Sequence, residues 1–148
     1  MSAGLHLATA ENAETCHGLA EKYHAEIGAT YDAVHRAAVI DPLLAGSPLG
    51  AIWLIGPPRA PLGYVLITFA WSIEAGGLIG WVREIFVRDK VRKRGIGTEA
   101  LTDVARALRG GGIQALHVTL PEQDQQRGFW QRARFATVSD HRVFTQKL

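Results

Sequence analysis

The sequence has very little cysteine, since Cys16 is the single one among 148 residues. One cysteine excludes an intramolecular disulfide and favours a reducing compartment. Long hydrophobic runs are missing too, because the longest apolar stretches have the length of a strand, far below the ~20 residues of a membrane span. Residues 1–15 lack a basic region followed by an apolar run, so we expect no signal peptide. These absences predict a soluble, cytoplasmic protein that does not insert into a membrane.

An excess of charge of one sign is also lacking. Sixteen Lys and Arg against fourteen Asp and Glu give a net charge of +2, too small to indicate a general nucleic-acid binder. A chain of this length can bury roughly 70% of its unfolded surface, so it needs no disulfide or structural metal to fold. No repeat, low-complexity tract or linker divides the sequence. We therefore expect a single domain over residues 1–148.

The hydrophobic pattern predicts the order of the elements. Helices are expected over residues 11–27, 32–44, 95–109 and 124–132, and Asp32 is placed to cap the second. Strands are expected over 5–8, 51–55, 62–69, 78–87, 115–120 and 136–144. The early strands should pair as an antiparallel hairpin, and the late strand–helix–strand unit should contain a right-handed parallel crossover. The predicted fold class is α/β (α+β), with a mixed sheet of about six strands and about four helices.

The most informative segment runs from Glu84 to Gly97, where a strand leads through a basic turn and two glycines into an amphipathic helix. A helix N-terminus presents unpaired backbone N–H groups and a partial positive charge. Glycines allow a phosphate to approach that backbone, and the arginines and lysines of residues 88–94 add positive charge. The pattern indicates an anion site. A solvated basic loop with an accidental glycine pair is the plainer alternative.

Two common phosphate motifs fit this segment poorly. No Gly-Lys-Ser or Gly-Lys-Thr is present, so the Walker pattern is absent. Residues 95–100 formally match the dinucleotide fingerprint G-x-G-x-x-A, but a long charged loop separates them from the strand end at Val87. A dinucleotide-binding fragment therefore stays a weaker hypothesis. A nucleic-acid role for the basic turn is weaker still, because the turn is short and lacks interleaved aromatic residues.

The segment resembles the GNAT superfamily of N-acetyltransferases. Its signature R/Q-x-x-G-x-G/A reads Arg92-Lys93-Arg94-Gly95-Ile96-Gly97 here, after the acidic-apolar-aromatic-Val strand end Glu84-Ile85-Phe86-Val87. The resemblance covers most of the chain and implies a mostly antiparallel sheet and acetyl transfer from acetyl-CoA to an amine of a small molecule or peptide. It also implies a cofactor site in which backbone N–H groups of the signature turn hold the pyrophosphate and the strand backbone pairs with the pantetheine arm. The cofactor-binding residues so implied are Phe86, Val87, Arg92, Lys93, Arg94, Gly95, Ile96, Gly97 and Thr98.

Acetyl transfer to an amine needs a base, a polarised carbonyl and a stabilised leaving thiolate. Glu84 is the first candidate for the base, directly or through water, and a salt bridge with Arg83 or another basic residue is its alternative role. Strand alternation places Arg83 and Glu84 on opposite faces unless a bulge intervenes. His117, on the next predicted strand, is the second candidate, because an unperturbed histidine titrates near neutrality. A structural role for a lone strand histidine is its alternative.

The C-terminal part departs from the family pattern. Many GNAT members carry a tyrosine that can protonate the leaving thiolate, and Trp130 stands at the matching position. Tryptophan has no acidic hydroxyl, although its ring can contact the cofactor and its indole N–H can donate. A catalytically silent acyl-CoA-binding or regulatory domain is therefore the alternative function. We expect no metal site, since His17 and His24 form no complete ligand set. A homodimer is a further expectation, by family resemblance and the exposed edge of an open sheet.

Overall fold

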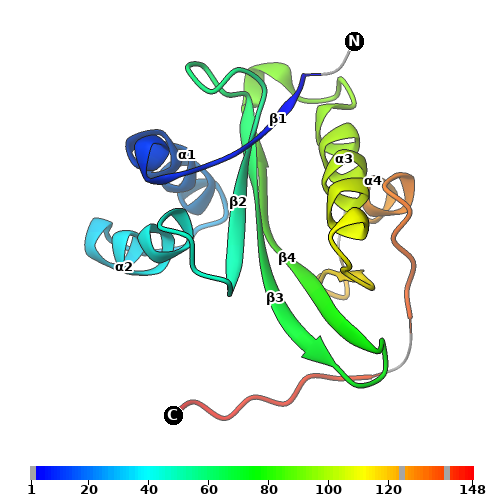
Figure 1. Cartoon of the computed structure of the whole chain (residues 1–148). Coiled ribbons are helices and arrows are strands. Elements are labelled where there is room, and N and C mark those ends of the chain that lie inside the picture. The colour runs from blue at the N-terminus through cyan, green and yellow to red at the C-terminus, as the bar shows by residue number, and fades with distance from the viewer. Residues whose placement is uncertain (1–2, 124–125, 139–140) are drawn as a thin grey trace.

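The computed structural model describes residues 3–123, 126–138 and 141–148 of the chain. Within these residues a five-stranded sheet has helices on both faces (Figure 1). All neighbouring strands are antiparallel except β4 and β5, which are parallel. In spatial order the strands are β1 (Leu5–Leu7), β2 (Gly50–Ile55), β3 (Gly63–Ser72), β4 (Gly77–Val87) and β5 (Leu116–His117).

Two helices cover one face of the sheet: α1 (Ala13–Glu26), which follows the short 3₁₀ turn η1 (Ala10–Asn12), and α2 (Ala33–Leu44). The α2 helix begins as the sequence predicts, because Asp32 Oδ1 accepts a hydrogen bond from the His35 N–H at 2.8 Å. Buried side chains of both helices form one core with the inner side chains of the sheet. This core includes Cys16, Leu19, Ala20, Ile40, Leu44, Ile52, Leu54, Tyr64, Leu66 and Phe86.

The opposite face carries α3 (Ile96–Gly110) and α4 (Arg127–Arg132) (Figure 1). The apolar side chains of α3 recur every three or four residues, so they form one stripe that packs on the sheet. Fully burying a side chain such as Leu101 contributes about 1.5–3 kcal/mol. This second core is made by Ile55, Val65, Ile67, Val82, Ala100, Leu101, Val104 and Trp130.

The predicted fold class is confirmed, as are the antiparallel hairpin of β2 and β3 and the parallel pairing of β4 with β5. The strand predicted over residues 136–144 is wrong for the part that the structure describes, where no strand forms; residues 139 and 140 lie outside it. The apolar side chains there have no face to cover, since Val138 and Phe144 are 83% and 90% exposed. The sheet therefore has five strands in the described residues, not about six.

Strand β5 is also shorter than the predicted 115–120. It pairs with β4 only at Gly80–Leu116 and Trp81–His117. Beyond Trp81, β4 continues to Val87 without a β5 partner, and the first turn of α3 follows shortly after this free stretch. The second half of β4 is therefore not covered by β5. No helix in the described residues has the length and apolar character needed to cross a membrane.

Candidate active site

The turn between β4 and α3 exposes a helix N-terminus. After the 3₁₀ turn η2 (Asp89–Val91), Lys93 and Gly95 take left-handed conformations with φ of 64° and 76°, and Gly95 is the N-cap of α3. An added Cβ on Gly95 would meet no atom within 4 Å, so its surroundings are open. The first backbone N–H groups of α3 have no partner inside the helix. The local structure thus has the open helix N-terminus that the sequence predicts here, and anion binding at it stays a prediction.

The basic side chains of this turn divide into two kinds. Arg92 is part of the framework: its Nε donates to Val87 O at 2.7 Å and its Nη2 to Glu26 Oε2 at 2.6 Å. The hydrogen bond to Glu26 raises the pKa of Arg92 further above its ordinary value. Lys93 and Arg94 are exposed, and no carboxylate in the described residues forms an ion pair with them. The charges of Lys93 and Arg94 are therefore not neutralised by an ion pair within the described residues, whereas that of Arg92 is paired with Glu26.

The two signature glycines have different roles. Gly97 is buried in the first turn of α3, and a Cβ there would lie 2.9 Å from Phe129 Cε1. The space beside Gly97 is filled by the ring of Phe129, so its missing side chain lets α4 pack on α3. Phosphate binding at either glycine stays a prediction; of the two, Gly95 is the one with open space where a Cβ would lie.

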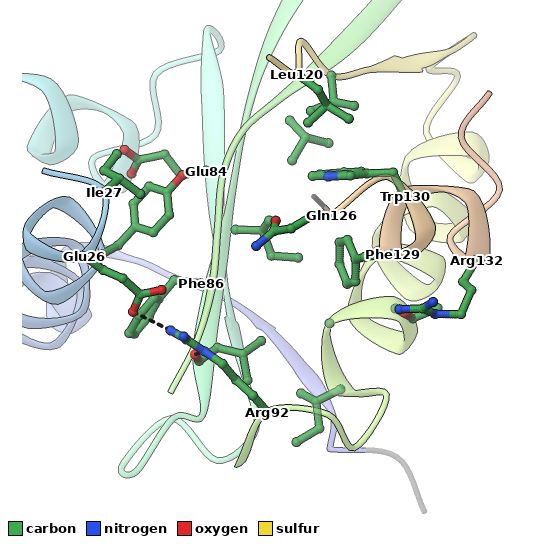
Figure 2. A pocket seen from close by; sticks show the side chains of 18 of the residues that line it. Glu26, Ile27, Glu84, Phe86, Arg92, Leu120, Gln126, Phe129, Trp130 and Arg132 are labelled. Atoms are coloured by element: carbon green, nitrogen blue, oxygen red, sulfur yellow. Dashed lines mark hydrogen bonds and ion pairs between the residues drawn. The ribbon is translucent and has the colours of Figure 1, made fainter. Parts of the chain in front are cut away.

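A hollow of about 950 Å³, which we call the main cleft, begins at this helix N-terminus. It runs between β4 and α4 and reaches Glu84 (Figure 2). Figure 2 shows Trp130 and Phe129 of α4 on one side of the sheet and the side chains of Glu84 and Phe86 of β4 on the other side, towards α1. The residues expected to bind a cofactor line the cleft except for Arg94: they are Phe86, Val87, Arg92, Lys93, Gly95, Ile96, Gly97, Thr98 and Trp130.

Trp130 is only 5% exposed, and its indole Nε1 has no hydrogen-bond partner in the described residues. The ring is held edge-to-face between Phe129 and Phe135, with ring centres 5.2 Å away on each side. A buried N–H without an acceptor costs free energy on the order of 1–3 kcal/mol. Trp130 thus lines the main cleft while its indole N–H is enclosed by protein atoms.

Glu84 is held by two side chains from other elements. Tyr64 Oη donates a hydrogen bond to Glu84 Oε1 at 2.8 Å, and His24 Nε2 lies 2.6 Å from Glu84 Oε2, within hydrogen-bonding distance. Burial, followed by the nearby Glu84 charge, raises the pKa of Tyr64 above its ordinary value, so the phenol stays a neutral donor. Two hydrogen bonds leave about two further lone-pair sites on the carboxylate free. Glu84 is thus an oriented acceptor beside the main cleft.

A β-bulge sets the direction of the neighbouring side chain. Leu66 of β3 pairs with Glu84 and the next residue, Ile67, pairs with Val82, so Arg83 has no partner across the ladder. Arg83 then points to the same face as Glu84, where its Nε donates to Thr68 Oγ1 at 2.9 Å. The exception named in the sequence argument therefore applies: a bulge intervenes, and the extra residue puts Arg83 and Glu84 on one face.

A second hollow, the side pocket, opens on this face with a volume of about 270 Å³. Arg83 and Glu84 line both the side pocket and the main cleft, so the two spaces meet at these residues. The other walls of the side pocket come from α1, α2, β3 and the segment before α2. These wall residues are His24, Tyr31, His35, Val39, Ile40, Leu43, Leu66 and Thr68.

Other candidates from the sequence lie elsewhere. His117 lines neither hollow; its ring packs against Trp81 with centres 4.9 Å apart. His17 pairs with Asp41 at 2.6 Å while His24 pairs with Glu84, so the two histidines serve different partners. Within the described residues no three His, Cys, Asp or Glu side chains are grouped so as to hold a metal ion. Burial raises the pKa of the Cys16 thiol to about 11, which leaves it protonated and unreactive near neutrality.

The structure adds residues that sequence reasoning missed. His24 and Tyr64 lie 60 and 20 positions from Glu84, so no local spacing points to their hydrogen bonds. A weak signal existed for His24, which falls on the apolar stripe of α1 and is buried there. A buried histidine needs a polar partner, and a carboxylate on the facing strand is the natural one.

Comparison with known proteins identifies the group to which this site belongs. The model of the acetyltransferase (GNAT) family matches residues 14–135, most of the chain. The chain belongs to the GNAT family. Acyl transfer is the general chemistry of GNAT proteins, and their usual donor is acetyl-CoA.

Solved structures agree with this assignment. An integron cassette protein from the mobile metagenome of Cole Harbour Salt Marsh is 31% identical, with a TM-score of 0.82 over 97% of this chain and 90% of that one. A putative acetyltransferase from Arthrobacter sp. FB24 is 22% identical, with a TM-score of 0.80 over 98% and 96%. An aminoglycoside acetyltransferase from an uncultured soil metagenomic sample, in complex with sisomicin, shares the fold at 11% identity and a TM-score of 0.76 over 97% and 96%. No match was found among curated proteins.

Proposed function

We propose that this GNAT protein is an N-acetyltransferase that moves the acetyl group of acetyl-CoA to a primary amine of a small molecule or peptide. The observation that carries the proposal is the position of Glu84. Its carboxylate is oriented by Tyr64 and His24 at the point where the main cleft meets the side pocket. A donor in one space and an amine in the other would meet at this carboxylate.

The main cleft suits acetyl-CoA in size and charge. Its volume of about 950 Å³ lies at the upper end of the range for ligand pockets. The open N-terminus of α3 at Gly95 suits the pyrophosphate, together with Lys93, which lines the cleft and forms no ion pair within the described residues. The free stretch of β4 at Phe86 and Val87 suits the amide groups of the pantetheine arm.

In the proposed reaction, bound acetyl-CoA supplies the acetyl group as a thioester. A bond forms between the amine nitrogen and the acetyl carbon, the carbon–sulfur bond breaks, and the sulfur leaves as a thiolate that takes a proton from water to become a thiol. Glu84 accepts the proton that the amine gives up, directly or through water. Tyr64 and His24 keep the carboxylate in place. Trp130 has no acidic hydroxyl and gives up no proton.

The test is the release of free CoA thiol by the purified chain with acetyl-CoA and a panel of primary amines. We expect Glu84→Gln to lower kcat by roughly 100-fold or more, the usual contribution of a general base, with acetyl-CoA binding by calorimetry unchanged. Glu74→Gln is the matched control, since Glu74 is an exposed carboxylate in the β3–β4 turn and lines neither hollow. Tight acetyl-CoA binding without turnover on any amine would instead favour a catalytically silent binding domain, which the tryptophan at position 130 also suits.

A further inference from the structure

The side pocket has an apolar wall made by two elements. Ile40 and Leu43 of α2 and Leu66 of β3 line it, together with the partly exposed Val39. Tyr31 and His35 stack at 4.6 Å with planes only 19° apart, which adds a flat ring surface. Such a wall favours a small hydrocarbon or aromatic group over a polar chain. At about 270 Å³ the pocket is smaller than the usual space for a drug-sized ligand.

The opposite wall of the side pocket carries a fixed positive charge. Arg83 is held by its hydrogen bond to Thr68 and lies 5.2 Å from the centre of the Trp81 ring. No carboxylate in the described residues lies within ion-pair distance of Arg83. The neighbouring Glu84 forms its hydrogen bonds with Tyr64 and His24 instead. A guanidinium that is anchored at Nε but pairs with no protein anion keeps its other N–H groups for a ligand carboxylate.

The bulge brings these two charges together. In a regular strand, adjacent residues point to opposite faces, but here Arg83 and Glu84 point to the same one. They present a cation and an anion side by side at the mouth of an apolar pocket. An α-amino acid has the complementary arrangement, with an ammonium and a carboxylate on one carbon and a side chain beyond them.

We propose that the acceptor is a free α-amino acid with an apolar or aromatic side chain, of the size of leucine to phenylalanine. Its amine lies at Glu84, its carboxylate at Arg83, and its side chain between α2 and Leu66. This assignment rests on the proposed function, since it names the acceptor for the same transfer. It distinguishes the substrate from a peptide N-terminus, whose neighbouring group is an uncharged amide.

The experiment compares acceptors that differ in one group, with CoA thiol release as the readout. L-Phenylalanine is set against L-phenylalaninamide and 2-phenylethylamine, which lack the carboxylate, and against glycine, which lacks the side chain. We expect kcat/KM for L-phenylalanine to exceed each of the other three by roughly 10- to 100-fold, the usual effect of one charge-assisted hydrogen bond or one buried side chain.

Variants then locate the carboxylate site. In the Arg83→Gln variant, the ratio of kcat/KM for L-phenylalanine to kcat/KM for its amide should fall to about three or less. Arg83→Lys keeps the charge and should retain part of this ratio. Arg106→Gln, on the exposed side of α3, is the control and should leave the ratio unchanged. Equal turnover of acid and amide, or a preference that survives Arg83→Gln, overturns the amino-acid assignment and leaves the acetyltransferase proposal standing. Failure to release thiol with every amine overturns both.

Discussion

Replacing Gly97 by alanine tests how α3 and α4 are joined beside the cleft. The new Cβ would lie 2.9 Å from Cε1 and 3.2 Å from Cζ of Phe129, closer than ordinary contact. The ring cannot withdraw freely, because it packs edge-to-face on Trp130. Overpacking of this kind costs about 1–3 kcal/mol, and the higher helix propensity of alanine returns up to about 1 kcal/mol. We expect a net loss of about 1–2 kcal/mol, or a Tm lower by about 2–8 °C.

Thermal and urea unfolding measure this loss, and the same helix supplies the controls. Gly110→Ala, at the last residue of α3, meets no atom within 4 Å and should be neutral or slightly stabilising. Gly95→Ala also meets no atom, but the residue has a φ of 76°, so it should cost about 1–2 kcal/mol through backbone strain alone.

A double-mutant cycle isolates the contact. Phe129→Leu removes the ring atoms that the new Cβ would approach, so Gly97→Ala should cost much less in that background. Full stability of the Gly97→Ala protein, with no coupling to position 129, would refute the packing argument. Phosphate approach would then be the reason that glycine stands at position 97.

Two further predictions concern buried groups. Burial raises the pKa of Cys16 from 9.0 to about 11, so between these two pH values the thiol loses its proton in the unfolded chain but keeps it in the folded one. The free energy of unfolding should therefore fall by about 2–3 kcal/mol as pH rises through this window. Measured by urea unfolding at a series of pH values, this fall should be absent from the Cys16→Ala variant. The same fall in both the wild-type and the Cys16→Ala protein would show that Cys16 is not its cause. Tyr64→Phe keeps the ring and removes one hydrogen-bond donor to Glu84. We expect about 1.5 kcal/mol of destabilisation and a lower kcat, with the affinity for acetyl-CoA unchanged. A lower Tm with an unchanged kcat would show that Tyr64 has a structural role only.

Features that depend on local sequence were predicted well. The α3 stripe repeats every three to four residues, Asp32 caps α2, and a short glycine–proline turn joins β2 to β3. Each of these is determined within about fifteen residues of chain. The signature turn at residues 92–97 belongs to the same class, which explains why the family could be recognised from sequence.

Features that depend on distant residues were not predicted. The direction of Arg83 depends on a bulge, which exists only in the register of β4 against β3. The role of Gly97 depends on Phe129, which is 32 positions further along the chain and fills the space that we had assigned to a ligand. The strand predicted over residues 136–144 had suitable residues but finds no partner in the described part of the sheet. Pairing and packing decide these outcomes, and neither can be read from one segment.

The bulge at Arg83 also means that the sheet does not need this residue. If Arg83 were deleted, Val82 and Glu84 would become neighbours in β4 opposite Ile67 and Leu66, which are neighbours in β3. The ladder would become regular, and all the remaining side chains of β4 would stay on their present faces of the sheet. Arg83 is thus an insertion that the fold tolerates but does not require, and a shorter chain lacking it would keep the same architecture while losing the cation of the side pocket.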